Sequence, residues 1–369
     1  MKMIKLLHAA DLHLDSPFEG LPDGKAAQRR SEQRSLLRKI AQIAEVEQVQ
    51  LVLLAGDLFD SDITYAETAE TLVRTLGEMR VPVFISPGNH DYFSSRSPYA
   101  KLKFPDNVHI FSSGELECVE LPTLGARVWG AAFTDKYAPC LINGVRAQKS
   151  DDTLDIMCIH GEVNASSQYN PMTEQQLAQS GMDYVALGHI HKGSGLKRAG
   201  GTWYAWPGCP EGRGFDETGD KEVYIVGIID DECRIKPIKT SQRKYEILNV
   251  ELDGKNALEA IKDRLDDKTE SDIYRIILRG ESSEAPDISN LQRTLEGRFY
   301  SLQLRDETRV HRDIWYGAGE DTLRGQFLAR LKDAFENAHD EAEREKITQA
   351  VRWGLAALEK REEVVRHDD

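Results

Sequence analysis

Short apolar runs alternate with helical patterns along the first 240 residues of the chain. Residues 51–55 form a continuous apolar run, as expected for a strand that is buried on both faces of a parallel sheet. Residues 25–48 and 66–79 carry apolar positions at helical spacing. Further strands are expected at 4–9, 81–85, 108–111, 117–121, 127–132, 154–159, 183–187, 222–230 and 233–239. This order begins as βαβα and continues mostly as β, which predicts a layered α/β sandwich with two sheets.

The pattern changes after residue 244. Over 245–304 it predicts strand, helix, strand, helix, strand, which makes a compact second unit of the α+β kind. From residue 321 it predicts two amphipathic helices, interrupted near His339-Asp340. Their apolar stripes are Leu323, Phe327, Leu328, Leu331 and Phe335, then Ile347, Val351, Leu355 and Leu358. We therefore predict three parts, residues 1–240, 245–318 and 319–369, and leave open whether the last part packs on the body or is held out for a partner.

Charge narrows the classes of function. The 369 residues include 47 Lys and Arg against 62 Asp and Glu, which gives a formal charge of −15. The charge is −8 over residues 1–240 and −7 over the rest, so neither part is a basic module. Because phosphate neutralisation needs a positive surface, this excludes a protein that coats DNA unaided.

Cysteine usage and the start of the chain indicate the compartment. The five cysteines are scattered and never spaced as CxxC, which argues against disulfides and against a thiolate zinc site. His8 and Asp11 come before a signal-peptide apolar core could form, and no stretch approaches the ~20 apolar residues of a membrane span. We expect a cytoplasmic protein without membrane attachment.

Five short segments place His, Asp or Asn in a turn directly after a predicted strand. They are Asp11-Leu12-His13, Gly56-Asp57-Leu58-Phe59-Asp60, Gly88-Asn89-His90-Asp91, His160-Gly161 and Gly188-His189-Ile190-His191. Loops beyond the carboxyl ends of strands are where α/β sheets bind ligands, and glycine lets the backbone turn tightly there. Alternate residues such as Asp11 and His13 would point the same way if the backbone stayed extended.

The residue types favour a metal centre. Carboxylate, imidazole and amide ligands together suit Mn²⁺, Fe²⁺ or Zn²⁺ and do not suit an all-oxygen Ca²⁺ cage. A single DxH or HxH is usually structural, and His8, inside the first strand, fits a core histidine. The GDLFD and GNHD segments are more specific, because polar runs straight after buried strands need a reason. Seven candidate ligands besides His90 are too many for one ion, so two ions that share a carboxylate are expected.

The series DxH, GDLFD, GNHD, HG and GHIH resembles the calcineurin-like metallophosphoesterases, and its GDLFD and GHIH forms resemble the SbcD-type DNA repair nucleases. Residues 8–21, the segment Pro207–Arg213 and Glu217-Thr218-Gly219 resemble the YhaO-like branch of that family. The resemblance rests on specific motifs over residues 1–240. Beyond them it rests only on the order of the predicted elements and the size of the parts. It implies a four-layer αββα metallophosphoesterase sandwich with a small α+β cap domain and C-terminal helices.

The resemblance also implies roles for the site residues. One ion would be held by Asp11, His13, Asp57 and His191, and the other by Asp57, Asn89, His160 and His189, with Asp57 bridging. His90 would steady the transition state and help to protonate the leaving oxygen. Asp91 would orient His90 or serve the turn structurally. Cys209 departs from the small polar residue expected after Pro-Gly, which puts substrate contacts, but not the metals, in doubt.

Three functions compete. The resemblance favours a Mn²⁺-dependent DNA exonuclease that works with an SbcC-like coiled-coil ATPase. The C-terminal helices of this chain would dock that ATPase. The alternatives are a phosphodiesterase or phosphatase for small nucleotides and a non-catalytic scaffold of the same fold. The charge of −15 predicts that the chain alone binds DNA weakly, although two bound ions would attract phosphate locally. A homodimer is left open.

Overall fold

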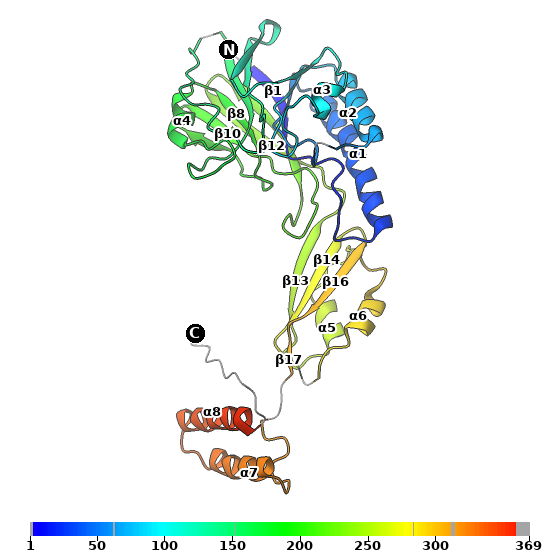
Figure 1. Ribbon diagram of the computed structural model, residues 1–369, viewed down its shortest axis with the longest axis vertical. Helices are drawn as coiled ribbons and strands as arrows, with labels where there is room; N and C mark the ends of the chain where they lie inside the picture. The colour runs from blue at the N-terminus through cyan, green and yellow to red at the C-terminus, as the bar shows by residue number, and fades with distance from the viewer. Residues whose placement is uncertain (1–2, 62, 151, 283, 311–313, 359–369) are drawn as a thin grey trace. The chain divides into compact units, whose positions relative to one another are not determined.

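Two six-stranded β-sheets form the body of the protein in the computed structural model, which describes residues 3–61, 63–150, 152–282, 284–310 and 314–358 (Figure 1). The first sheet has the order β12-β11-β1-β2-β3-β4 and the second β5-β6-β7-β8-β10-β9. The strands of the first sheet are β1 (Met3–Ala9), β2 (Leu51–Leu54), β3 (Val83–Ile85), β4 (Val108–Ile110), β11 (Glu222–Ile229) and β12 (Glu232–Lys239). Those of the second are β5 (Glu117–Leu121), β6 (Ala126–Gly130), β7 (Leu154–His160), β8 (Tyr184–Gly188), β9 (Lys197–Ala199) and β10 (Thr202–Ala205).

Helices cover the outer faces of the two sheets. On the first sheet lie α1 (Asp23–Val46) and α2 (Ala66–Glu78), and their apolar positions, such as Leu37 and Leu72, pack on the sheet in one core cluster. On the second sheet lies α4 (Glu174–Gln179), where Leu177 is fully buried. A short helix α3 (Pro98–Lys101) and a 3₁₀ turn at Pro122–Leu124 complete the connections.

The two sheets bury a common core between them. Leu6, Leu53 and Val226 of the first sheet share one cluster with Ile156 and Ala186 of the second. β1, β2, β3 and β4 pair in parallel, as do β6, β7 and β8, so the carboxyl ends of consecutive strands meet at one edge of each sheet. This layering confirms the predicted αββα sandwich and the metallophosphoesterase fold expected from it.

A three-stranded sheet follows the body, with the order β13-β14-β16. Its strands are β13 (Tyr245–Glu251), β14 (Ile273–Arg279) and β16 (Ser301–Asp306), and α5 (Ala257–Lys262) and α6 (Ile288–Leu295) separate them along the chain, in the predicted order. A two-stranded pair, β15 (Glu281–Ser282) with β17 (Arg309–Val310), was not predicted.

Contacts along the chain divide it into two compact units. The first comprises residues 1–248, 266–276 and 295–303, and the second comprises 249–265, 277–294 and 304–369. The functional boundaries 1–240, 245–318 and 319–369 stay a prediction, and the part of the last range beyond residue 358 lies outside the described residues.

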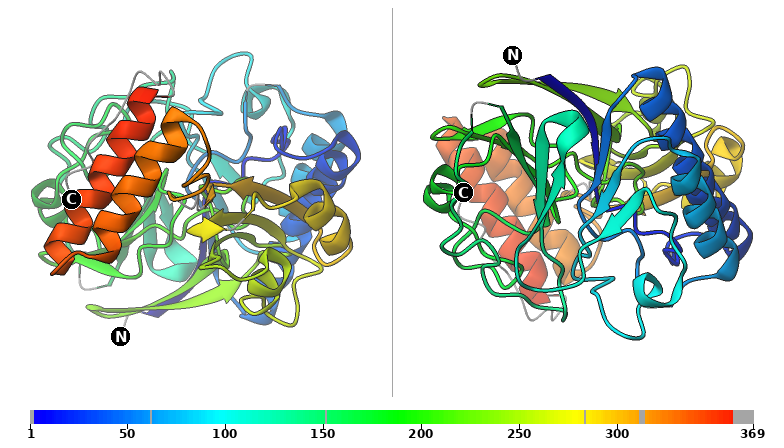
Figure 2. Two further views of the ribbon diagram at one scale, coloured as in Figure 1. Left: turned by 90° about the horizontal axis from the view of Figure 1, so that it is seen from below. Right: turned by 90° about the horizontal axis from the view of Figure 1, so that it is seen from above.

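The helices α7 (Leu323–Glu336) and α8 (Glu341–Leu358) lie side by side (Figure 2). They are interrupted where predicted, near His339-Asp340. A Cβ on Gly354 would lie 2.1 Å from Cζ of Phe327, so the absence of a side chain at this position allows the close approach of the two helices. Within the described ranges, no helix is both long and apolar enough to cross a membrane.

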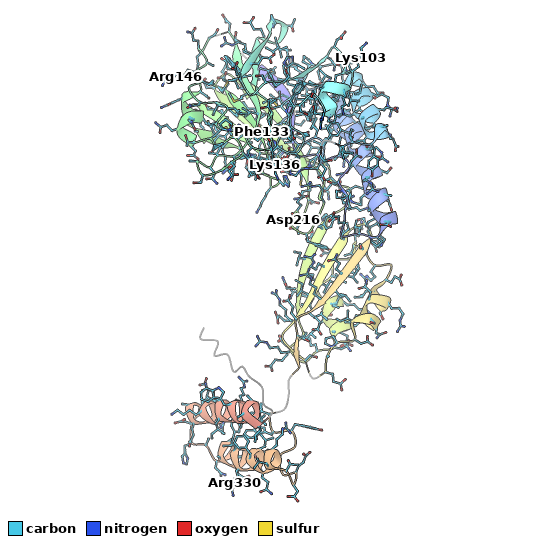
Figure 3. The ribbon with its side chains drawn as sticks, viewed as in Figure 1. Lys103, Phe133, Lys136, Arg146, Asp216 and Arg330 are labelled. Carbon is cyan, nitrogen blue, oxygen red and sulfur yellow. The ribbon has the colours of Figure 1, made fainter. Side chains whose placement is uncertain are left out.

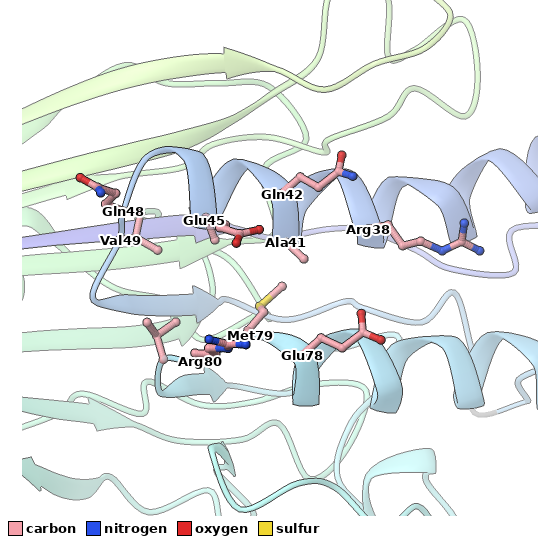
Figure 4. Close-up of a pocket in the computed structure, with 11 residues that line it drawn as sticks. Arg38, Ala41, Gln42, Glu45, Gln48, Val49, Glu78, Met79 and Arg80 are labelled. Atoms are coloured by element: carbon pink, nitrogen blue, oxygen red, sulfur yellow. The ribbon is translucent and has the colours of Figure 1, made fainter.

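A groove opens between the end of α1 and the end of α2 (Figure 4). Charged side chains of both signs line it, among them Arg38, Glu45, Glu78 and Arg80. None of the residues predicted to act in the site lines this groove. The candidate site lies instead at the ends of the strands.

Candidate metal centre

All seven predicted ligands lie at or just beyond the carboxyl ends of strands in the first compact unit. Asp11 and His13 follow β1, Asp57 follows β2, and Asn89 follows β3 in the first sheet. His160 ends β7, and the pair His189 and His191 follows β8 in the second sheet. Because both sheets end at the same side of the sandwich, the fold brings together residues that are far apart in the sequence.

One set of side chains surrounds the Nε2 atoms of two histidines. Nε2 of His13 lies 3.2 Å from Nε2 of His191. Oδ1 of Asp11 is 3.9 Å from the latter nitrogen, and Oδ2 of Asp57 is 3.7 Å from the former. One potential ligand atom of each of Asp11, His13 and His191 lies within 4.8 Å of the others, a spacing that a single metal ion could bridge.

A second set adjoins the first through Asp57. Nε2 of His160 lies 2.9 Å from Oδ1 of Asn89 and 3.4 Å from Oδ2 of Asp57. Nδ1 of His189 lies 3.1 Å from the same Asn89 oxygen. Asp11, Asp57 and His160 also satisfy the 4.8 Å spacing, so the two sets are contiguous.

The protonation pattern of the histidines fits divalent cations. Nδ1 of His160 donates to the carbonyl of Ala55 at 2.9 Å, so the neutral ring carries its lone pair on Nε2. That lone pair faces the oxygens of Asn89 and Asp57, which are acceptors as well. In the first set, Nδ1 of His191 donates to Oε1 of Glu217 at 2.7 Å, so Nε2 is the nitrogen that faces into the cluster. Burial would lower the pKa of His191, but the hydrogen bond to Glu217 and the charge of Asp11 raise it. Converging acceptors repel one another unless a cation lies between them, and a metal ligand whose other ring nitrogen is hydrogen-bonded is the usual arrangement at metal sites.

The family follows from a comparison with known proteins. Residues 4–193 match the model of the calcineurin-like phosphoesterases, a range that contains all seven predicted ligands. The chain belongs to this family. The resemblance that the sequence suggested is thereby confirmed.

Individual relatives refine the placement. The "uncharacterized metallophosphoesterase YhaO" of Bacillus subtilis is 33% identical over 66% of this chain and 61% of its own length. A subunit of the SbcCD nuclease from the same bacterium is 25% identical over 60% of this chain and 66% of that protein. The "DNA double-strand break repair protein Mre11" of Saccharolobus solfataricus is 24% identical over 76% of each chain. The chain thus spans about three fifths of the length of YhaO and about two thirds of the SbcCD subunit.

The backbone at this phosphoesterase site is strained. Asp11, His13, Asp57 and His189 all have positive φ, between 43° and 97°, which costs a non-glycine residue about 1–3 kcal/mol. The backbone is therefore not extended here, so the condition under which alternate residues such as Asp11 and His13 would point the same way is not met. The side chains converge with the backbone in the left-handed region at both Asp11 and His13. Non-glycine residues persist in such conformations only where the surrounding structure fixes them, and they cluster at functional sites.

Glycine permits the close approach of the loop after β3, which carries Gly88, to the loop after β2, which carries Asp57. A Cβ on Gly88 would lie 2.2 Å from Oδ1 of Asp57, so only glycine fits beside that carboxylate. Phe133, labelled in Figure 3, packs beside His160, with its ring edge-on to the imidazole at a centroid distance of 5.5 Å.

Burial and neighbouring charges set the ionisation of the site. Burial raises the pKa of Asp11 to about 6, although His160 and His191 act in the opposite direction. Burial would raise the pKa of Asp57 as well, but nearby histidines, first His160, lower it to about 2. Burial lowers the pKa of both His13 and His189 to about 4. The two histidines are therefore neutral near pH 7, which is the form that binds metal.

His90 and Asp91 are neighbours in sequence, but the first is exposed and the second is buried. The His90 ring is exposed, its backbone N–H donates to Oδ1 of Asp57 at 2.9 Å, and its Nδ1 donates to the carbonyl of Asp60 at 3.1 Å. Asp91 is buried and accepts hydrogen bonds from the backbone N–H of Leu58, Phe59 and Gly88 and from the hydroxyl of Tyr99. These contacts are those of the structural turn role that the sequence left open for Asp91.

Other residues singled out from the sequence have plain structural places. His8 is buried, with Nδ1 2.9 Å from the Tyr184 hydroxyl and Nε2 3.1 Å from the Leu187 carbonyl, which confirms the core histidine. Cys209 is buried with Sγ 3.5 Å from the His191 carbonyl, and burial raises the pKa of its thiol well above the ordinary value. The thiol is therefore not a nucleophile at neutral pH.

Three residues next to the ligands were not predicted. Asp60, Arg213 and Glu217 surround the outer nitrogens of His13 and His191. Arg213 and Glu217 enter the family resemblance only as parts of motifs, and no spacing rule relates them to Asp60, which precedes Arg213 by 153 positions.

Proposed function

We propose that the chain is a two-metal phosphodiesterase that hydrolyses DNA phosphodiester bonds as an exonuclease and works with an SbcC-like coiled-coil ATPase. The observation that carries the catalytic part is the convergence of acceptor atoms around Asp57, from both sheets, in a member of the calcineurin-like phosphoesterase family. The names of two relatives, a nuclease subunit and a DNA break repair protein, support DNA as the substrate.

The two sets of side chains would hold one ion each. Asp11, His13, Asp57 and His191 form one set, and Asp57, Asn89, His160 and His189 form the other. We propose Mn²⁺ as the native ion, since mixed nitrogen and oxygen donors suit it, and Fe²⁺ or Zn²⁺ would fit the same donors. Bound divalent ions would supply Lewis-acid charge beside the scissile phosphate.

His90 would act on the substrate from the rim of the site. Its backbone is fixed by Asp57 and its Nδ1 by the Asp60 carbonyl, so the exposed ring is held at one orientation. A histidine placed in this way can transfer a proton to the leaving oxygen as the ester bond breaks. Asp91 would contribute by holding the two loops that carry Asp57 and Asn89, which makes it a positioning residue.

The C-terminal helices would dock the ATPase. Leu323 of α7 and Trp353 of α8 are large apolar side chains that are 76% and 51% exposed. Exposed apolar side chains on a pair of helices are suited to contact the side of a coiled coil. Co-purification of the ATPase with the wild-type chain, but not with Trp353→Glu, would test this role.

The proposed compartment is the cytoplasm. All five cysteines are free, including the buried Cys158, Cys209 and Cys233, as expected where thiols stay reduced. A homodimer stays a prediction.

One comparison tests the proposed reaction. The purified chain is incubated with Mn²⁺ and either end-labelled linear DNA or bis-p-nitrophenyl phosphate, alongside Asp57→Ala and, as control, the exposed surface variant Asp106→Ala. We expect DNA cleavage that Asp57→Ala abolishes and Asp106→Ala retains. Activity on the small ester alone would instead indicate a phosphodiesterase or phosphatase for small nucleotides. Absence of activity with Mn²⁺, Fe²⁺ and Zn²⁺ would indicate a scaffold.

A further inference from the structure

The two histidines of the first ligand set each face an acidic side chain with their outer nitrogen. Nδ1 of His13 lies 3.2 Å from Oδ1 of Asp60, and Nδ1 of His191 lies 2.7 Å from Oε1 of Glu217. At His191 the carboxylate accepts a hydrogen bond from Nδ1, which fixes the ring and directs Nε2 inward. At His13 the contact with Asp60 lacks hydrogen-bond geometry, and the carboxylate acts on the ring through its charge. Both rings of the first set therefore lie against acidic side chains that are not candidate ligands themselves.

A single arginine joins the two carboxylates. Nη1 of Arg213 lies 3.0 Å from Oδ1 of Asp60, and its Nη2 lies 2.6 Å from Oε1 of Glu217. The backbone N–H of Arg213 donates to the second oxygen of Glu217 at 2.8 Å. The Arg213 side chain is 19% exposed and the Glu217 side chain 3% exposed, so water screens these charges little. Without Arg213, two nearby carboxylates would repel each other in a buried place.

The second ligand set is fixed in another way. The Nδ1 proton of His160 goes to the carbonyl of Ala55, a backbone group of the loop after β2, and not to an acidic side chain. The amide of Asn170 donates to the backbone carbonyl of His160 at 2.8 Å and holds the end of β7. Arg213 contacts His191 and the two carboxylates of the first set, so its influence falls on one metal position and not on both.

We infer that Arg213 is a positioning residue for one of the two metal positions, because it clamps Asp60 and Glu217 against His13 and His191. The inference rests on the proposed two-metal site, and it adds that the affinity of only one of the two metal positions depends on Arg213. Loss of Arg213 weakens binding at the position of Asp11, His13, Asp57 and His191, and leaves the position of Asn89, His160 and His189 occupied. Loss of a residue of this kind lowers metal affinity about 10–100-fold.

The test measures Mn²⁺ binding to metal-free protein in the absence of substrate. The variants are Arg213→Met, which removes the guanidinium, and Arg213→Lys, which keeps the charge but cannot bridge two carboxylates with a planar fork. Arg127→Met is the matched control, because Arg127 pairs with the buried Asp155 at 2.8 Å and has a similar exposure of 22%, but contacts none of the ligands. Isothermal titration gives the affinities and stoichiometry, and electron paramagnetic resonance distinguishes a coupled pair of Mn²⁺ ions from a single ion.

The expected result is two ions for the wild type and Arg127→Met. Arg213→Met should bind one ion with unchanged affinity and a second ion about 10–100-fold more weakly, with loss of the coupled signal. Arg213→Lys should bind the second ion with an affinity between that of the wild type and that of Arg213→Met. Two ions at wild-type affinity in Arg213→Met, or an equal loss of both ions, would overturn the inference.

A milder variant protects the test against misfolding. Asp60→Asn alters a side chain that is 25% exposed and leaves the Arg213–Glu217 pair intact. If Arg213→Met does not fold, selective weakening of one ion in Asp60→Asn supports the inference, and unchanged binding of both ions overturns it. A wild-type protein that binds fewer than two ions refutes the two-metal site itself, and this outcome is seen before any variant is compared.

Discussion

The carboxylate of Asp91 accepts a hydrogen bond from the backbone N–H of Leu58 at 2.7 Å, and so ties the loop after β3 to the loop after β2. Leu58 follows Asp57, and Asp91 comes two residues after Asn89, so this one contact sets the spacing between two proposed ligands. The tie is buried and includes the backbone N–H of Gly88. The position of Asp57, the proposed bridging carboxylate, therefore depends on a buried side chain that is not itself a proposed ligand.

Replacement of Asp91 by alanine should cost stability and metal binding together. The buried N–H groups of Leu58, Phe59 and Gly88 would lose their acceptor, at about 1–3 kcal/mol for each donor left unpaired. Urea unfolding of the metal-free protein and Mn²⁺ titration measure the two effects. Wild-type stability in Asp91→Ala would show that the tie is dispensable, and the exposed variant Asp106→Ala controls for loss of a carboxylate.

Replacement of His90 by alanine should spare metal binding and reduce turnover. The exposed ring can be removed without opening a cavity, while proton transfer of this kind contributes about 10²–10⁴-fold to rate. Bound Mn²⁺ and hydrolysis of bis-p-nitrophenyl phosphate are measured on the same preparation. Wild-type rates from metal-loaded His90→Ala would refute the catalytic role. A fall in bound Mn²⁺ would make His90 a ligand, since it also lies within ligand spacing of His13 and Asp57.

Replacement of Gly88 by alanine should abolish binding of Mn²⁺. The added methyl group would lie 2.2 Å from Oδ1 of Asp57 and would displace the carboxylate that both ligand sets share. Gly24→Ala is the matched control, because nothing lies within 4 Å of a Cβ there and alanine favours the helix α1. Unchanged binding of two ions in Gly88→Ala would contradict the proposed position of Asp57.

Acid should destabilise the first compact unit partly through Glu32. Burial would raise the pKa of Glu32, but hydrogen bonds from Arg243 and Arg29 hold it below its ordinary value. A carboxyl group with a lowered pKa stabilises the fold above its unfolded pKa, about 4.3, and that contribution is lost as the pH falls through the folded value. Glu32→Gln should therefore lower the free energy of unfolding at pH 7 and flatten its decrease from pH 6 to pH 3.

Urea titrations at several pH values give this slope. Glu67→Gln is the control, because the carboxylate of Glu67 is 73% exposed and its ion pair with Arg34 should contribute little. Equal slopes for the wild type and Glu32→Gln would remove Glu32 from the account of acid sensitivity.

The isolated chain should bind DNA weakly. A formal charge of −15 repels the phosphate backbone, so we expect a Kd in the non-specific range of about 10⁻⁴–10⁻⁶ M at physiological salt, and weaker binding as salt rises. Fluorescence anisotropy of a labelled duplex measures this Kd with the chain alone and with the proposed ATPase partner. Nanomolar binding by the chain alone that resists salt would contradict the prediction.

The sequence revealed the two main sheets because their strands carry local signals. The run Leu51–Leu54 is wholly buried and has no polar position. So short and so uniformly apolar a run is typical of a strand inside a parallel sheet. β9 and β10 were missed because they are only three and four residues long and turn through Gly200-Gly201. β10 is stabilised by parallel pairing with β8, and no local pattern shows that pairing.

The candidate ligands could be predicted because the signal is again local in the sequence. The charged residues that contact them could not be predicted. Each candidate ligand is a polar residue at or just after an apolar run, so its neighbours in sequence disclose it. Asp60, Arg213 and Glu217 are charged residues of loops, and a charged residue in a loop is ordinarily solvated. Only the fold shows that Arg213 reaches across 153 positions to Asp60.

The carbonyl of Ala55 has a consequence for how such a centre can change during evolution. A backbone acceptor is present whatever side chain occupies the position, so point mutation cannot alter the group that orients His160 without moving the strand end itself. The acids beside His13 and His191 are side chains and can be exchanged one codon at a time. Natural variation in metal preference should therefore accumulate around one ion, while the environment of the other is inherited with the fold.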